Sequence, residues 1–129
     1  LPRLHFWVGF LGILAFLATG LYMHHALDHL NGMADGPRLL FRSAHIYLLL
    51  TALLNLAVGV YMQPAASRAR PALHYVISSI ILLSPWAMLA GFFIGAPENT
   101  LARPLIRMSL YALFAVAITL TAHHFWRSK

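Results

Sequence analysis

The chain has 129 residues, of which 60% are hydrophobic and only 9% are charged. Because a soluble domain averages about 25% charged residues, this composition excludes a globule covered by a polar surface. The chain contains no cysteine, which excludes disulfides, thiolate metal sites and iron–sulfur clusters. The net charge of +6 favours contact with anionic lipid headgroups. The sequence has no basic patch of the kind that would predict binding of nucleic acid.

Four apolar runs, residues 6–23, 44–62, 75–96 and 108–122, contain no Asp, Glu, Lys or Arg. A bilayer core about 30 Å thick needs roughly 20 apolar residues in a helix. We therefore predict an all-α integral membrane protein with four transmembrane helices in an up-down bundle. It forms a single domain, residues 1–129, with spans at about residues 4–28, 38–63, 71–95 and 102–126. The first run lacks the small-residue cleavage site of a signal peptide, so we interpret it as a span.

The first predicted helix begins near Pro2 and carries small residues at three-residue spacing, which predicts a close packing seam with another helix. Gly and Pro residues in the connection that follows break the helix, and Pro37 suits the first turn of the second helix. Asn55, in that second helix, lies near the middle of the membrane. Because an unpaired amide is costly there, we expect Asn55 to hydrogen-bond to another helix.

The third predicted helix begins near Pro71, and Pro85 should kink it because proline lacks the amide proton. The fourth helix begins near Pro104. Lys and Arg number five on the side of the termini and four on the opposite side, which favours cytoplasmic termini. We expect the chain in the inner (plasma) membrane of a bacterium.

The eight histidines fall into two layers, one near each face of the membrane. Two such layers could hold two b-type hemes, since each heme needs imidazoles from two helices and cations for its propionates. The predicted heme-binding residues are His25 and His45 with Arg38 and Arg42 in the outer layer, and His74 and His124 in the inner layer. Alternatively, the histidines are interfacial residues whose rings reach the headgroups.

The segment from Met23 to His29 predicts a second kind of site. If the first helix continues past the membrane, His25 and His29 share one face, and His24 and Asp28 share the next. Imidazoles with a carboxylate suit zinc or Cu(II), whereas thioethers from Met23 and Met33 would favour Cu(I). The predicted metal ligands are His24, His25, Asp28 and His29.

The predicted function is a small histidine-rich membrane subunit that binds heme b or a metal within a redox complex. The alternatives are an accessory or assembly subunit, or a membrane protein that binds copper or zinc. Its expected partners are the lipid bilayer and other membrane subunits or a second copy of the chain. No carboxylate lies inside the four apolar runs and no phosphate-binding glycine loop is present, so we do not expect an enzyme on its own.

Overall fold

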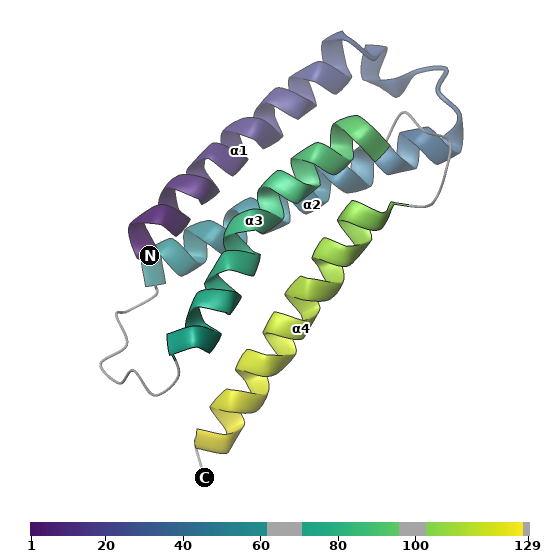
Figure 1. Ribbon diagram of the computed structural model, residues 1–129. Coiled ribbons are helices and arrows are strands. Elements are labelled where there is room, and N and C mark those ends of the chain that lie inside the picture. Colours follow the sequence, from purple (N-terminus) through teal and green to yellow (C-terminus); the bar gives the residue numbers. More distant parts are fainter. Residues whose placement is uncertain (62–70, 96–102, 128–129) are drawn as a thin grey trace.

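The computed structural model describes residues 1–61, 71–95 and 103–127 (Figure 1). This part of the chain is all-helical. It forms α1 (Pro2–His25), the short 3₁₀ helix η1 (Asp28–Leu30), α2 (Asp35–Tyr61), α3 (Pro71–Gly95) and α4 (Pro104–Arg127). The beginning of α1 and the end of α4 lie at the same end of the molecule, as an up-down order requires (Figure 1).

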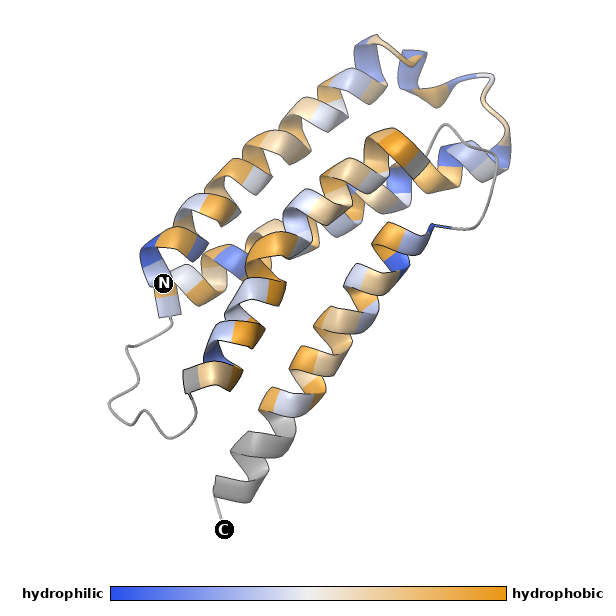
Figure 2. Cartoon of the chain, viewed as in Figure 1, coloured by the Kyte–Doolittle hydropathy of each residue, from blue (hydrophilic) through white to orange (hydrophobic). Residues whose placement is uncertain are grey.

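Three of these helices are long and apolar enough to cross a membrane, namely Pro2–His25, Asp35–Tyr61 and Ala72–Ile94. Their outer faces expose large apolar side chains such as Leu14, Leu21 and Leu50. Hydrophilic residues collect mostly toward the helix ends (Figure 2). The described helices are therefore compatible with a membrane in length and composition, since a helix satisfies its own backbone hydrogen bonds there and apolar side chains can face lipid. The apolar part of α4 within the described residues is shorter, Pro104–Leu120.

The seam predicted for the first helix is confirmed in the contact between α1 and α2. A Cβ atom added to Gly9 would lie 2.6 Å from the backbone nitrogen of Leu56, and one added to Gly12 would lie 2.8 Å from the Cβ of Ala52. Such distances leave no space for a side chain. The two helices therefore approach closely because glycine occupies these positions.

An apolar core cluster lies toward the end of the bundle where η1 joins α1 to α2. Its members come from η1 and all helices except α1: Leu30, Leu40, Phe41, Ala44, Leu48, Met88, Phe92 and Ile106. The turn after α1 is thus packed into the core through Leu30, which is 3% exposed.

Pro85 lies inside α3, which continues through it as one helix. Proline has no amide proton, so the carbonyl of Ile81, four residues earlier, loses its usual helical donor. Two side chains replace that donor. Ser84 Oγ donates to the Ile81 carbonyl at 2.8 Å, and Asn55 Nδ2 on α2 donates to the same oxygen at 2.7 Å. The proline therefore creates an acceptor that links α2 to α3, and the prediction that Asn55 bonds to another helix is confirmed.

Candidate functional site

The turn after α1 has an unusual backbone that positions one predicted ligand. Three consecutive residues, Asp28, His29 and Leu30, have φ values of 43°, 55° and 63°. This left-handed region costs an L-residue roughly 1–2 kcal/mol. The turn is closed by hydrogen bonds from Leu30 N to Leu27 O and from Asn31 N to Asp28 O. Burial of Leu30 in the core offsets the strain, and the chain folds back so that His29 lies over the end of α1.

The pairing predicted from a continuous helix is wrong, because α1 ends at His25. His24 does not pair with Asp28, and His25 does not pair with His29. Instead, His24 Nδ1 lies 3.1 Å from His29 Nδ1, and the two rings meet edge to face with centroids 3.9 Å apart. In the neutral pair, one Nδ1–H donates and the other Nδ1 accepts.

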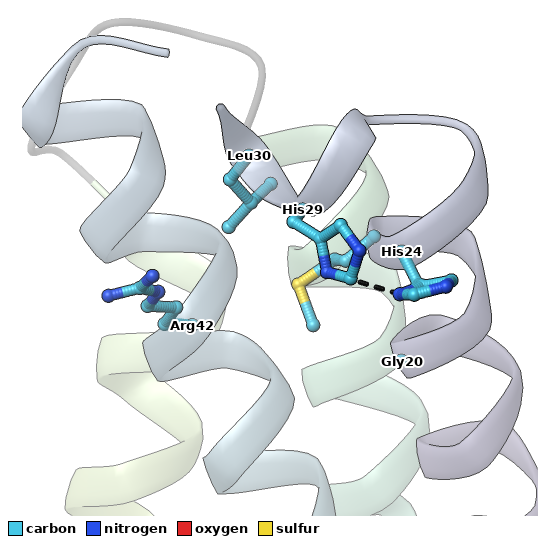
Figure 3. A pocket seen from close by; sticks show the side chains of 6 residues that line it. Gly20, His24, His29, Leu30 and Arg42 are labelled. Atoms are coloured by element: carbon cyan, nitrogen blue, oxygen red, sulfur yellow. Dashed lines mark hydrogen bonds between the residues drawn. The ribbon is translucent and has the colours of Figure 1, made fainter. Parts of the chain in front are cut away.

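These two imidazoles line an open pocket of about 260 Å³ at this end of the bundle. Figure 3 shows His24 and His29 facing one another, while the guanidinium of Arg42 lies apart from both rings. Within the described residues, the pocket lining contains no carboxylate. It consists of Gly20, Met23, His24, His29, Leu30 and Arg42.

The four ligands predicted from the sequence are not brought together into one metal site in this arrangement. Among the residues that the structure describes, no three His, Cys, Asp or Glu side chains form a group that could hold a metal ion. His25 is exposed and outside the pocket, although its ring lies 4.4 Å from that of His24. Asp28 is also exposed and outside the pocket. The structure thus brings together two of the four predicted ligands and adds Met23 beside them.

His45, predicted as a heme ligand, is half-buried between α1 and α2. Its Nδ1 lies 3.0 Å from Thr19 Oγ1, which donates its own proton to the Phe16 carbonyl at 2.9 Å. Thr19 therefore accepts from His45, so Nδ1 carries the proton and Nε2 keeps its lone pair. The His45 ring stacks on Phe16 at a centroid distance of 4.0 Å, and its Nε2 lies beside Gly20.

The other predicted heme ligands are not brought together. His74 is exposed, and its ring lies 6.2 Å from that of the neighbouring Tyr75. The side chain of His124 lies outside the described residues. Binding of heme by these histidines stays a prediction.

The two arginines predicted to bind propionates differ in their surroundings. Arg38 forms an ion pair with Asp35 one helical turn earlier. Arg42 is exposed and borders the pocket. Of these two arginines, Arg38 is paired with a carboxylate, and Arg42 has no carboxylate partner among the described residues.

A third arginine, not singled out by the sequence, fastens the start of α4 to α2. Arg103 donates to Ser43 Oγ at 2.9 Å and to the Leu40 carbonyl at 2.8 Å. Burial lowers the pKa of this guanidinium from its ordinary value, yet arginine stays charged in proteins. Within the described part of the chain, this is the polar link between α2 and α4.

Sequence reasoning also missed a buried polar network at the opposite end of the bundle. His5 is fully buried, with Nδ1 2.8 Å from Asn55 Oδ1 and Nε2 2.6 Å from Ser78 Oγ. Asn55 Nδ2 donates to the carbonyls of Thr51 and Ile81, so Oδ1 must face His5 and accept from its Nδ1–H. Ser78 then donates to Nε2 of the neutral ring. Both nitrogens of His5 are used in holding α1, α2 and α3 together.

Comparison with protein families, with curated proteins and with solved structures finds no match for this chain.

Proposed function

We propose that this chain is a membrane subunit of a redox complex that binds a metal ion between His24 and His29. The observation that carries the proposal is the distance of 3.1 Å between their Nδ1 atoms at the mouth of an open pocket. Two nitrogens that each lie about 2.0–2.1 Å from a tetrahedral metal are roughly 3.3–3.4 Å apart. The two rings would therefore separate slightly and turn, so that both lone pairs point at the metal.

The chemistry of the pair supports a neutral ligand set. In the hydrogen-bonded pair, a single proton lies between the two Nδ1 atoms. For a metal to bind both atoms, that proton moves to Nε2 of the same ring, and both imidazoles stay neutral. Binding then needs no net loss of a proton from the protein.

The exposed apolar faces of the helices support the proposal of a membrane subunit. The bundle carries large exposed apolar side chains on its described helices, among them Leu14, Ile46, Leu83 and Phe93. These faces would contact lipid, other membrane subunits or a second copy of the chain. We also propose that α4 is a fourth span, because 24 helical residues extend about 36 Å. The termini would then share the cytoplasmic side of a bacterial inner membrane.

The test is metal binding to the full chain purified in detergent. Wild-type protein is dialysed against Cu(I), Cu(II) or Zn(II), and bound metal is counted by elemental analysis. We expect one ion per chain for at least one metal. His24→Ala and His29→Ala should each abolish it.

His25→Ala is the matched control, because this neighbouring imidazole is exposed and lies outside the pocket. It should bind as wild type does. The proposal fails if wild-type protein binds no metal stoichiometrically, or if both pocket variants keep it.

The hydrogen bond of His45 favours heme b as a second candidate ligand. A proton held on Nδ1 by Thr19 leaves Nε2 free, which is the form of histidine that binds heme iron. The test is a reduced-minus-oxidised visible spectrum of protein from cells supplied with a heme precursor. Heme bands that disappear in His45→Ala would support this candidate, and a flat wild-type spectrum would exclude it for this chain alone.

A further inference from the structure

The pocket contains a third donor atom, a soft thioether sulfur, which narrows the choice of metal. Met23 lines the same pocket as His24 and His29 and is half-buried against the core cluster. Its side chain is thus held in place by apolar packing. We infer that the metal is Cu(I), bound by Nδ1 of His24, Nδ1 of His29 and the thioether sulfur of Met23. This inference rests on the proposed function and names its metal and third ligand.

The number of ligands favours Cu(I) over zinc. Structural zinc sites take four protein ligands and catalytic sites take three with a water, drawn from Cys, His, Asp and Glu. No group of three such side chains is present among the described residues. A thioether is a poor zinc ligand, whereas soft sulfur donors select Cu(I). Two imidazoles with one thioether therefore make an incomplete zinc site and a complete three-coordinate Cu(I) site.

The position of the pocket determines how copper would be exchanged. The rings of His24 and His29 are exposed, and the pocket that they line is open at the surface. An incoming ligand can reach the metal without any opening of the helices. We therefore expect fast exchange of Cu(I) with a competing chelator in solution.

The test compares two methionines under anaerobic conditions. Met23→Leu removes the sulfur with little change in volume, and cores tolerate such volume-conserving swaps well. Met33→Leu is the control, because Met33 is also half-buried against the core cluster and lies outside the pocket. Cu(I) affinity is measured by competition with a chromogenic chelator. We expect at least about a tenfold loss for Met23→Leu and no change for Met33→Leu.

X-ray absorption of the wild-type copper complex provides a second measurement that needs no variant. We expect two nitrogen scatterers and one sulfur scatterer in the first shell. Three results would overturn this inference in a protein that still binds metal stoichiometrically: no sulfur scatterer, unchanged Cu(I) affinity in Met23→Leu, or tighter binding of Zn(II) than of Cu(I). Each of them would leave the proposed function standing. Absence of any stoichiometric metal overturns both.

Discussion

His5 shows how a polar residue is accommodated inside an apolar bundle. Its ring is fully buried, and each nitrogen has one partner on a different helix. A buried donor without an acceptor costs about 1–3 kcal/mol. The network with Asn55 and Ser78 avoids that cost and makes this contact specific for one alignment of three helices. The same bonds remove His5 from any role as a metal or heme ligand.

The first prediction follows from this network. Asn55→Leu should lower the free energy of unfolding in detergent by about 1–3 kcal/mol, because His5 Nδ1–H and the Ile81 carbonyl each lose a partner. Thermal unfolding followed by circular dichroism measures the change. His5→Phe combined with Asn55→Leu should cost less than the sum of the single variants, since both unsatisfied groups of the pair are removed together. Additive costs would show that the two side chains are not coupled.

At the scale of the elements, the sequence predicts the helices well. The predicted spans 38–63 and 71–95 lie within three residues of α2 and α3 at each end. Length and hydropathy suffice for this, because a helix must satisfy its own backbone in a membrane. For the first helix, the sequence predicts an end at residue 28, three residues beyond the actual end at His25. Its position depends on the burial of Leu30, which a local pattern does not reveal.

The candidate site could be predicted only in part for the same reason. Histidine content near Met23 indicates a ligand cluster, yet the pairing depends on the left-handed turn at Asp28–Leu30. That conformation is rare for residues other than glycine, and burial of Leu30 in the core cluster helps to stabilise it. Likewise, the sequence predicts that Asn55 needs a partner. It does not identify His5, fifty residues away.

The second prediction concerns this turn. Leu30→Ala should weaken metal binding to the His24–His29 pair by at least about tenfold. The turn loses the side chain that packs it into the core, so His29 is no longer held in a fixed position. Leu39→Ala is the control, since Leu39 is exposed on the neighbouring helix. Elemental analysis over a series of metal concentrations measures both. Equal affinity in wild type and Leu30→Ala would mean that the turn needs no core contact to hold the ligands.

The third prediction concerns the seam between α1 and α2. Gly9→Ala places a methyl group where the backbone of α2 lies, so we expect a loss of about 1–3 kcal/mol in unfolding free energy. Gly36→Ala is the matched control, because a Cβ there meets no atom within 4 Å. It should leave stability nearly unchanged. Similar melting temperatures for the two variants would argue against close packing at Gly9.

At the scale of the whole molecule, α4 decides how many times the chain crosses the membrane. Arg103 links its start to α2, and Ile106 belongs to the core cluster at that end. The described surface of α4 beyond Val116 is exposed. A helix that is anchored at one end and has an apolar part over Pro104–Leu120 can cross the bilayer beside α3. The alternative is that it lies along the membrane surface.

Cysteine labelling distinguishes these two arrangements, and the absence of native cysteine makes each single variant unambiguous. In the intact cells that express the chain, Arg3→Cys, Asn31→Cys and Lys129→Cys are treated with a membrane-impermeant maleimide. With four spans, Arg3→Cys and Lys129→Cys lie on one side and react alike, whereas Asn31→Cys reacts oppositely. With cytoplasmic termini, only Asn31→Cys is labelled before the cells are lysed. If Lys129→Cys instead behaves like Asn31→Cys, α4 does not cross, and the molecule has three spans with its ends on opposite sides.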